Sequence, residues 1–374
     1  MKIAFVSTIL HYPWGGADVL WTRTAERALA ANHDVLLALS ATVSSHPRVT
    51  ALAAAGARLH LRSGLTHEFG NRDRLRHAAG HFLRSRRSLT AALARFQPDV
   101  LFLCQGGTFD FLVEDGLRRW LAPHRTAYVP ICQSNDARNS LPSSARAVAR
   151  NFFAGAAHTV FVSTHNRDLA GRQINAPVPR AKVLPNPVER VVAEIPWPDS
   201  PTARLAVVAR IASDPKGLDI MIAALERLTT NRAWEVSLFG RGPDETALRD
   251  EIVGRGLAER VLFRGYEPDL QRIWSTHHLL LLPSRCEGCA LALLEAVACG
   301  RPVLTTDTGG ASDWIEPGVN GWICPPGDVD ALATTLQSAL ERFDRWPEFG
   351  QAAQRLFRTR YVAEPDAQLL ALVN

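Results

Sequence analysis

At 374 residues the chain is longer than one hydrophobic core usually serves, so we expect two domains. Its 47% hydrophobic and 21% charged residues are typical of a globular protein and exclude a largely disordered chain. The formal net charge of +5 favours anionic ligands or surfaces but does not demand nucleic acid, which we do not expect as a partner. No apolar run of about 18 residues is present, so the sequence predicts no transmembrane helix.

The first apolar run, Lys2 to Ser7, predicts a buried strand and not a signal peptide, because no small-residue cleavage site follows it. We therefore expect a cytoplasmic protein. The following loop contains Gly15 and Gly16, and Asp18 then begins a helix. Two glycines in a strand-to-helix loop let the backbone approach a ligand closely, although the dinucleotide fingerprint GxGxxG is missing.

Further strands with helical stretches between them are predicted in the first half of the chain. They span residues 34–40, 58–62, 98–104, 126–132 and 159–163. This alternation favours a mostly parallel sheet covered by helices on both faces.

One predicted helix, residues 71–96, is strongly basic. Leu75, Phe82, Leu89 and Phe96 recur every seven residues, and seven arginines occupy the remaining face. Such a helix can lie on an anionic membrane surface. The alternative is that the apolar stripe packs on the sheet while the arginines are solvated. Contact with the inner face of a membrane is therefore one of two interpretations of this segment.

A proline-rich stretch, residues 177–201, marks a change of composition, and we predict the interdomain linker at 186–201. The N-terminal domain is expected at 1–185 and the C-terminal domain at 202–345. A helical tail at 346–374 is expected to pack back towards the N-terminal domain. The predicted strands of the second half are 204–209, 235–239, 261–265, 279–283, 302–307 and 320–324.

The strongest signal in the second half is the segment from Leu279 to Asp307. Its apolar runs predict two strands joined by a loop and a helix. In an open parallel sheet such a loop lies at the carboxyl edge, where ligands bind. Glu287 in the loop and Glu295 in the helix are eight positions apart, and the helix N-terminus between them offers N–H groups to an anion. An anion with many hydroxyl groups, such as a sugar nucleotide, suits this combination. Alternatively, Glu287 merely caps the helix that begins near Ala290.

Two cations are predicted at the same edge of the sheet. Arg210 ends the strand at 204–209, and Lys216 begins the next helix. Arginine offers a rigid bidentate fork to phosphate, and lysine a mobile point charge. Residues of this kind are often solvated surface groups, but their place in the same sheet as Glu287 favours phosphate binding.

The six cysteines do not make a disulfide framework in a chain of this length. Cys286 and Cys289 form a CxxC, but no second CxxC or His-rich tract accompanies it. Ordinary thiols are therefore favoured over a metal or redox pair. We expect no metal site and no cofactor.

Several motifs resemble the C-terminal domain of a family 4 glycosyltransferase with the GT-B fold. They are RIASDPKGLD, LFGRGPDETAL, VLFRGY and CEGCALALLEAVACGRPVLTTDTGGASDWIEPGVNGWICPPGD. The loop YPWGGAD resembles the N-terminal glycine loop of the same enzymes. The likeness is dense from Arg204 to Leu340 and thin before that, apart from the beginning of the chain. It implies an α/β protein of two Rossmann-like, doubly wound domains that face each other across a cleft.

The resemblance implies a retaining, metal-independent glycosyltransferase with a Glu-x7-Glu motif. Its donor would be a UDP- or GDP-linked sugar. Its acceptor would be a hydroxyl group of a small molecule or of a lipid-linked or cell-surface glycan in polysaccharide biosynthesis. Two alternatives stay open, a nucleotide-sugar epimerase of the same fold and a nucleotide-sugar-binding protein that has lost catalysis. The sequence leaves the base, the sugar and the acceptor open.

The resemblance also assigns roles to residues. Arg210 and Lys216 would hold the diphosphate, Glu287 would face the donor sugar, and Glu295 would bind the ribose hydroxyls. The other donor contacts that it implies are Gly15, Gly16, Gly240, Gly288, Cys289, Ala290 and Leu291. Many relatives carry a histidine after the fifth N-terminal strand, near the donor sugar, where this chain has none. Candidates for the sugar or acceptor side are His11, Gln133 and Asn135.

Overall fold

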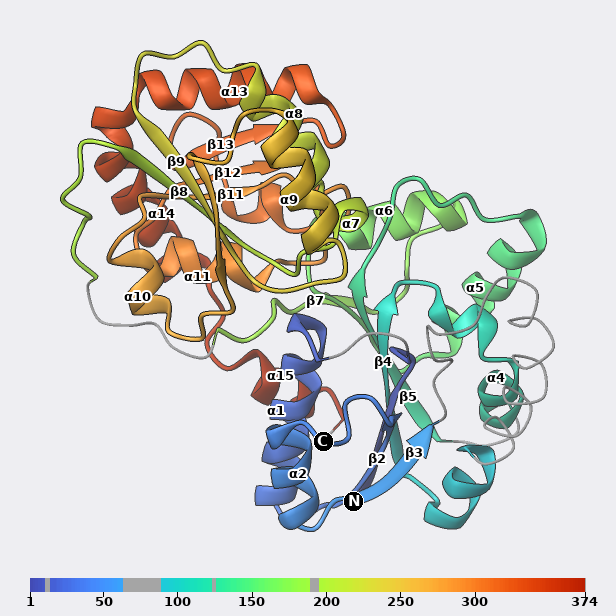
Figure 1. Cartoon of the computed structure of the whole chain (residues 1–374). Coiled ribbons are helices and arrows are strands. Elements are labelled where there is room, and N and C mark those ends of the chain that lie inside the picture. Colours follow the sequence, from blue (N-terminus) through green and yellow to red (C-terminus); the bar gives the residue numbers. More distant parts are fainter. Residues whose placement is uncertain (11–13, 63–88, 123–125, 189–194, 374) are drawn as a thin grey trace. The chain divides into compact units, whose positions relative to one another are not determined.

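The computed structural model describes residues 1–10, 14–62, 89–122, 126–188 and 195–373. The chain divides into two compact units (Figure 1). Unit 1 comprises Met1–Pro187 and Val362–Asn374, and unit 2 comprises Val188–Tyr361. Each unit is built on one parallel sheet, so the predicted fold of two Rossmann-like α/β domains is confirmed. None of the helices in the described ranges is both long and apolar enough to cross a membrane.

Unit 1 contains a seven-stranded sheet in the order β3-β2-β1-β4-β5-β6-β7. Its strands are β1 (Lys2–Ser7), β2 (Asp34–Ser40), β3 (Arg58–Arg62), β4 (Val100–Gly107), β5 (Ala127–Ser134), β6 (Thr159–Phe161) and β7 (Ala181–Val183). Its helices include α1 (Val19–Ala30), α2 (Pro47–Ala54), α4 (Asp115–Leu121), α5 (Ser143–Gly155), α6 (Thr164–Ile174) and the 3₁₀ helices η1 (Gly16–Asp18) and η2 (Asp110–Val113). The central strands β1, β2 and β4 are almost continuously apolar and buried, as strands covered on both faces must be.

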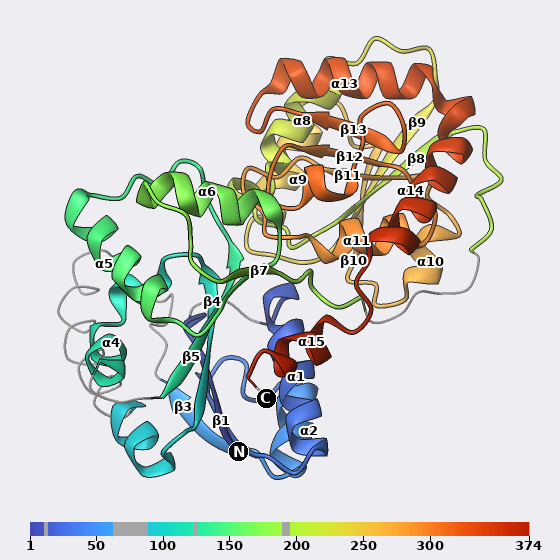
Figure 2. The same ribbon diagram turned by 180° about the vertical axis from the view of Figure 1, so that it is seen from behind.

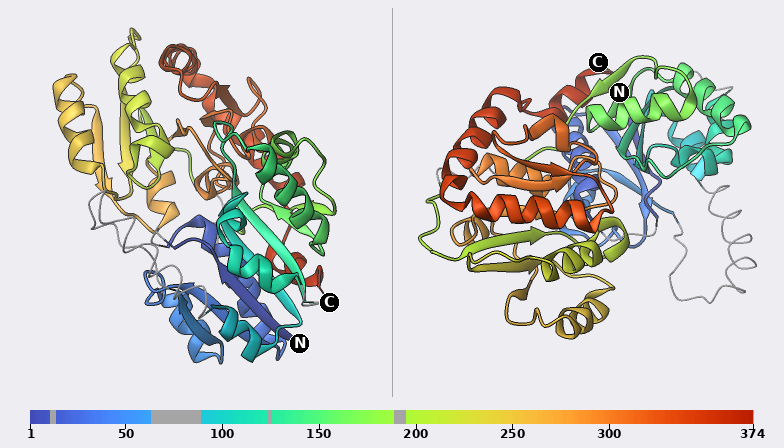
Figure 3. Two further views of the ribbon diagram at one scale, coloured as in Figure 1. Left: turned by 90° about the vertical axis from the view of Figure 1, so that its right-hand side faces the viewer. Right: turned by 90° about the horizontal axis from the view of Figure 1, so that it is seen from above.

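Unit 2 contains a six-stranded sheet in the order β10-β9-β8-β11-β12-β13. Its strands are β8 (Ala203–Val208), β9 (Trp234–Phe239), β10 (Val261–Gly265), β11 (Leu279–Leu282), β12 (Val303–Thr306) and β13 (Gly321–Cys324). Its helices are α7 (Ser213–Lys216), α8 (Leu218–Glu226), α9 (Glu245–Gly254), α10 (Leu270–Trp274), α11 (Leu291–Ala298), α12 (Ala311–Trp314), α13 (Val329–Glu341), η3 (Phe343–Arg345) and α14 (Trp346–Arg360). Helices cover the sheet on both faces, with α8 beside α13 and α11 beside α14 (Figure 2; Figure 3).

Both sheets reverse their strand order at one point, and in unit 2 this point lies between β8 and β11. The two strands pair directly, with Leu205 opposite Leu279 and Ala206 opposite Leu280. Because the connections after these strands diverge to opposite faces of the sheet, a doubly wound sheet has its ligand crevice here. The topology therefore places the loop after β8 beside the loop after β11.

The predicted basic helix at 71–96 lies mostly outside the described residues. Only its last part, residues 89–96, is described, and it is helical. Leu89, Leu93 and Phe96 are buried in the core of unit 1, so this part of the apolar stripe packs inward. The arginines on which the membrane interpretation depended lie outside the described residues, apart from Arg95.

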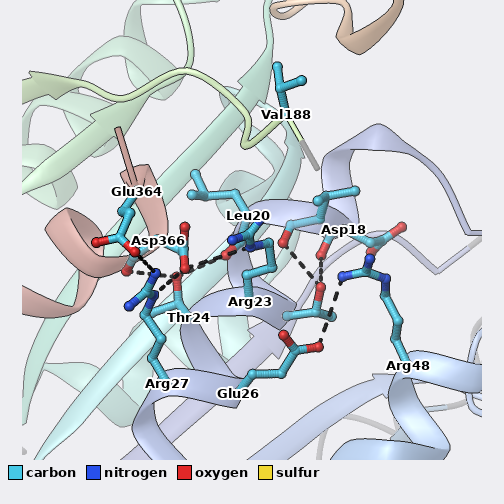
Figure 4. A network of polar contacts seen from close by, with 12 residues as sticks. Asp18, Leu20, Arg23, Thr24, Glu26, Arg27, Arg48, Val188, Glu364 and Asp366 are labelled. Atoms are coloured by element: carbon cyan, nitrogen blue, oxygen red, sulfur yellow. Dashed lines mark hydrogen bonds and ion pairs between the residues drawn. The ribbon is translucent and has the colours of Figure 1, made fainter. Parts of the chain in front are cut away.

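The C-terminal segment belongs to unit 1, where α15 (Pro365–Ala371) packs against α1. Figure 4 shows the polar contacts that join the two helices. Asp366 is buried and pairs with Arg27 and, at 3.7 Å, with Arg23. Glu364 also pairs with Arg27, at 2.8 Å. The sequence predicted a helical pattern through the whole tail, whereas the structure interrupts it between α14 and α15, with Glu364 at a φ of 55°.

Arg301, in the Gly-Arg-Pro-Val motif, holds the start of unit 2 to its sheet. Its guanidinium group is buried and donates to the carbonyl oxygens of Pro196 at 2.7 Å and Trp274 at 2.6 Å. Burial lowers the pKa of Arg301 to about 10. The contacts of this motif arginine are thus structural, and they fix the segment that leads into β8.

Candidate active site

The loops after β8 and β11 meet through an ion pair. The Nζ atom of Lys216 donates a hydrogen bond to Oε1 of Glu287 at 2.6 Å, and the hydroxyl group of Ser284 donates to the same oxygen at 2.7 Å. The side chains of Lys216 and Glu287 are 23% and 13% exposed. The resemblance assigned Arg210 and Lys216 to the diphosphate and Glu287 to the donor sugar. The structure brings two of these three residues, Lys216 and Glu287, together at the switch point of the sheet.

Arg285 ties these two loops to each other. Its guanidinium group donates to both carboxylate oxygens of Asp219, at 2.8 and 2.5 Å. It also donates to the carbonyl oxygens of Ser213 and Asp214, both at 3.1 Å, and so satisfies acceptors of the short helix α7. Burial acts to raise the pKa of Asp219, but the hydrogen bonds and charge of Arg285 outweigh it, so this pKa is lowered.

Two glycines allow two other segments of the backbone to approach the Glu287 loop closely. Gly217 has a φ of 61°, and a Cβ atom there would lie 2.0 Å from the carbonyl oxygen of Pro283. Gly309 has a φ of 53°, and its Cβ would lie 2.1 Å from the carbonyl oxygen of Gly288. Only glycine fits at both positions. The loop that carries Glu287 is therefore clamped between two segments of backbone.

The N-terminal cap of α11 is Ala290, whose side chain makes no capping hydrogen bond, so Glu287 does not occupy the cap position of this helix. Leu291 is the first residue of this helix, and Glu295 lies half-buried one turn further on. Cys289 is buried against Gly310, and this burial raises the pKa of its thiol well above the ordinary range.

Arg210 and Gly240 lie at the carboxyl ends of β8 and β9. Arg210 is half-buried, two residues beyond the end of β8, and its carbonyl oxygen accepts from the N–H group of Ala212 at 2.9 Å. Gly240 has a φ of 149°, and a Cβ atom there would lie 1.9 Å from the carbonyl oxygen of Ala209. The glycine is thus required by the packing of the two loops, whatever ligand they bind.

In unit 1, the glycine loop is held by a buried carboxylate. The N–H group of Gly15 donates to Oδ2 of Asp18 at 3.0 Å, and the indole N–H of Trp21 donates to Oδ1 at 3.1 Å. Burial raises the pKa of Asp18. The N–H group of Gly15 is therefore already engaged within unit 1, while Gly16 begins η1. His11 lies outside the described residues.

The two remaining candidates in unit 1 lie at the carboxyl end of β5, Gln133 within the strand and Asn135 directly after it, and they differ in their environment. The side chain of Gln133 is buried, and its Nε2 atom has no hydrogen-bond partner among the described residues. Asn135, in contrast, donates to Oε1 of Gln173 at 2.8 Å and accepts from the N–H group of Asp136 at 2.9 Å. These contacts make Asn135 part of the structure of the loop, and leave Gln133 as the stronger candidate for contact with a ligand.

Asp110 was not predicted from the sequence, although it lies at the switch point of the first sheet. Its Oδ2 atom accepts hydrogen bonds from the N–H groups of Gly106 and Gly107, both at 3.0 Å, and from the hydroxyl group of Thr8 at 2.9 Å. Burial raises the pKa of this carboxyl group. Asp110 therefore joins the ends of β1 and β4. No sequence motif marks it, because two of its three partners named here are backbone N–H groups.

Ser284, Arg285 and Asp219 were also missed by sequence reasoning. Each belongs to a quoted motif or borders one, but only the pairing of β8 with β11 brings them together. All six cysteines lie within the described residues, and none forms a disulfide. The part of the chain that the structure describes contains no group of three or more His, Cys, Asp or Glu side chains suited to a metal ion.

The segment that carries this site is similar to a known sequence family. Residues 202–342 match the family model described as "Glycosyl transferases group 1". Over 142 residues the chain is 34% identical to the amylovoran biosynthesis glycosyltransferase AmsK of Erwinia amylovora, covering 36% of this chain and 35% of that protein. Over 164 residues it is 29% identical to the lipopolysaccharide core biosynthesis mannosyltransferase LpcC of Rhizobium leguminosarum bv. viciae, covering 42% of this chain and 47% of that protein. The aligned part thus spans about a third to a half of these two relatives.

Two solved structures resemble the whole chain. Anabaena Alr3699/HepE, determined in complex with UDP, has a TM-score of 0.72 at 19% identity, covering 99% of this chain and 98% of that one. Sucrose-phosphate synthase from Thermosynechococcus elongatus has a TM-score of 0.73 at 18% identity, covering 99% and 97%. At such identities the likeness establishes the fold, and the activity has to be argued from the site.

Proposed function

We propose that this chain is a glycosyltransferase that moves a sugar from a nucleoside-diphosphate sugar to a hydroxyl group of a glycan or lipid-linked acceptor. The observation that carries this proposal is the meeting of Lys216 and Glu287 at the switch point of unit 2, within the segment that matches the family. A cation and a carboxylate in one crevice suit a ligand with an anionic diphosphate and a hydroxyl-rich sugar.

The chemistry that we propose is a displacement with retention at the anomeric carbon. The acceptor oxygen forms its bond to that carbon on the face from which the diphosphate leaves, and the hydroxyl proton passes to the departing phosphate oxygen. Positive charge develops on the sugar ring as the glycosidic bond breaks. Lys216 and Arg210 would stabilise the leaving diphosphate, and Glu287 the charge on the ring.

The identity of the donor is the next part of the proposal. The Anabaena structures contain UDP or UDP-glucose, so a uridine nucleotide is the first candidate and a guanosine nucleotide the second. We also propose that no metal ion is needed, because the side chains of Arg210, after β8, and of Lys216, in α7, can stabilise the negative charge of the leaving group. Addition of EDTA should then leave the rate of transfer unchanged.

The two alternatives have weaker support. The relatives described above are transferases, and none of them supports an epimerase. A binding protein without catalysis would not need to keep Lys216 and Glu287 together. Incubation of the donor alone separates the epimerase, because only that enzyme would release an isomerised sugar without an acceptor.

Two measurements test the proposal. Thermal unfolding with UDP, GDP and ADP should show stabilisation by one of them, by roughly 2.7 kcal/mol at 100 times its Kd. Transfer should then be assayed with the matching donors and with extracted glycan acceptors, and the anomeric configuration of the product read by NMR. An inverted product would contradict retention, and absence of nucleotide binding would contradict the proposal as a whole.

A further inference from the structure

The hydrogen bond between Lys216 and Glu287 joins two groups that the proposed function assigns to different parts of the donor. Lys216 would hold the diphosphate and Glu287 the sugar, yet their side chains are in contact at 2.6 Å. The pair is largely shielded from water, with the two side chains 23% and 13% exposed. A contact of this length between opposite charges is strong enough to influence ligand binding.

An arriving diphosphate competes for the same cation. Its oxygens need the ammonium group of Lys216, but the carboxylate of Glu287 already lies within hydrogen-bonding distance of that group. Like charges brought together in a shielded site repel each other, so the diphosphate cannot simply be added beside the carboxylate without a cost. A diphosphate carries more negative charge than one carboxylate, so it is the stronger partner for Lys216.

We propose that the Lys216–Glu287 hydrogen bond is a resting-state contact that the donor diphosphate replaces, and that Ser284 keeps Glu287 in place when Lys216 turns to the phosphate. The inference rests on the proposed function, in that it takes a nucleoside diphosphate as the ligand of this crevice. It adds a role for Glu287 in the empty enzyme and a positioning role for Ser284.

Ser284 is suited to this task because it is neutral and fixed. It donates to Oε1 of Glu287 at 2.7 Å, and its side chain does not compete with phosphate for charge. The residue is 1% exposed, and its carbonyl oxygen accepts from the hydroxyl group of Thr306 at 2.5 Å. The backbone on either side is clamped by Gly217 and Gly309, so the exchange requires movement of the lysine side chain alone.

The exchange predicts that loss of the Glu287 charge strengthens the binding of a nucleoside diphosphate. Removing the charge of Glu287 frees Lys216, so a free nucleoside diphosphate should bind more tightly to Glu287→Gln than to the wild type. We expect a gain of about tenfold, the effect of one charge-assisted hydrogen bond that no longer has to be broken. The free nucleoside diphosphate is the right probe because it lacks the sugar. Its affinity is therefore not changed by the loss of the contact between Glu287 and the sugar.

The experiment is isothermal titration calorimetry of UDP and GDP, using whichever nucleotide the wild type binds more tightly. Glu287→Gln and Glu287→Ala should both bind it about tenfold more tightly, and Lys216→Ala should bind it at least tenfold more weakly. Asp307→Asn is the matched control, because Asp307 is an exposed carboxylate that follows the neighbouring strand β12. If the affinity for the nucleotide depends only on long-range charge, it will rise as much in Asp307→Asn as in Glu287→Gln, and this result would contradict the exchange.

Ser284→Ala tests the positioning role. We expect its affinity for the diphosphate to stay within about threefold of the wild type, while kcat falls by about tenfold, because Glu287 is no longer held for the sugar. Unchanged kcat in a folded Ser284→Ala variant would overturn this role.

Unchanged or weaker binding by both Glu287 variants, with Lys216→Ala still defective, would overturn the exchange and leave the proposed function intact. A wild type that binds neither UDP nor GDP would instead overturn the proposed function.

Discussion

Arg285 should be one of the most important residues for the stability of unit 2, because it serves three partners on the neighbouring loop. A charge pair at about 4 Å is worth roughly 4 kcal/mol at an effective dielectric constant of about 20, before screening. The Arg285 and Asp219 side chains are 19% and 39% exposed, so solvent screening reduces their mutual term to about 1 kcal/mol. The hydrogen bonds to the carbonyl oxygens of Ser213 and Asp214 add about 1–2 kcal/mol together. We therefore expect Arg285→Ala to lower the free energy of unfolding of unit 2 by about 2–3 kcal/mol.

Hydrogen exchange followed by mass spectrometry in increasing urea measures this loss separately for unit 2. The double-mutant cycle with Asp219→Ala should give a coupling free energy of about 1 kcal/mol. Arg249→Ala is the control, because Arg249 pairs with Glu245 on its own helix and stacks on the ring of Phe263, so its loss should cost about 1 kcal/mol. If Arg285→Ala lowers the free energy of unfolding no more than Arg249→Ala does, or if the coupling free energy with Asp219 is near zero, Arg285 does not hold the two loops together as argued.

The pKa of Asp219 gives an independent check through pH. Because this pKa is lowered in the folded chain, the ion pair stabilises the protein above the unfolded value of about 3.9. The stabilisation is lost as the pH falls through the lower folded pKa. The stability difference between wild type and Asp219→Asn should therefore shrink below about pH 4, and a difference that grows in acid would contradict the assignment.

Three further predictions concern the same loops, the ribose contact and the membrane. Gly217→Ala should destabilise unit 2 by at least about 1–2 kcal/mol and reduce nucleotide binding, since the left-handed backbone there has no room for a Cβ atom, as melting and calorimetry would show. Glu295→Gln should raise the donor KM with kcat nearly unchanged, because bonds to ribose are the same in ground and transition states, so a selective loss of kcat would contradict the ribose role. If the basic segment 71–96 contacts lipid, co-sedimentation with anionic liposomes should fall with salt and after replacement of Arg84, Arg86 and Arg87 by serine, at about 1 kcal/mol per arginine.

Much of the fold could be predicted because the strands of each unit are short apolar runs separated by glycine and polar loops. The predicted bounds of β1, β2, β3 and β10 are those of the structure, and the other predicted strands differ by a few residues at their ends. The sequence did not predict β7, whose three residues pair at the edge of the sheet beside a proline-rich stretch. Nor did it predict α7, a single turn that ends where Gly217 adopts a left-handed conformation.

The candidate site was predicted in position but not in its internal contacts. The residues Arg210, Lys216 and Glu287 could be assigned to the carboxyl edge because each follows an apolar strand. Which loops touch depends on strand order, and only the pairing of β8 with β11 brings Lys216 to Glu287. The same holds for Arg285 and Asp219, which are distant in sequence and become partners through the close approach at Gly217.

The choice of lysine at position 216 follows from the exchange that we propose, and it leads to a last prediction. A lysine ammonium is a mobile point charge, whereas an arginine fork binds a carboxylate through two parallel hydrogen bonds. In Lys216→Arg the resting contact with Glu287 could therefore become bidentate, as it is between Arg285 and Asp219. The charge is conserved, yet the diphosphate would have to break a stronger contact, so we expect its affinity to fall by about tenfold. Combining Lys216→Arg with Glu287→Gln should restore it. If Lys216→Arg alone binds the diphosphate as well as the wild type, charge at this position is sufficient, and the mobility of lysine has no part in donor binding.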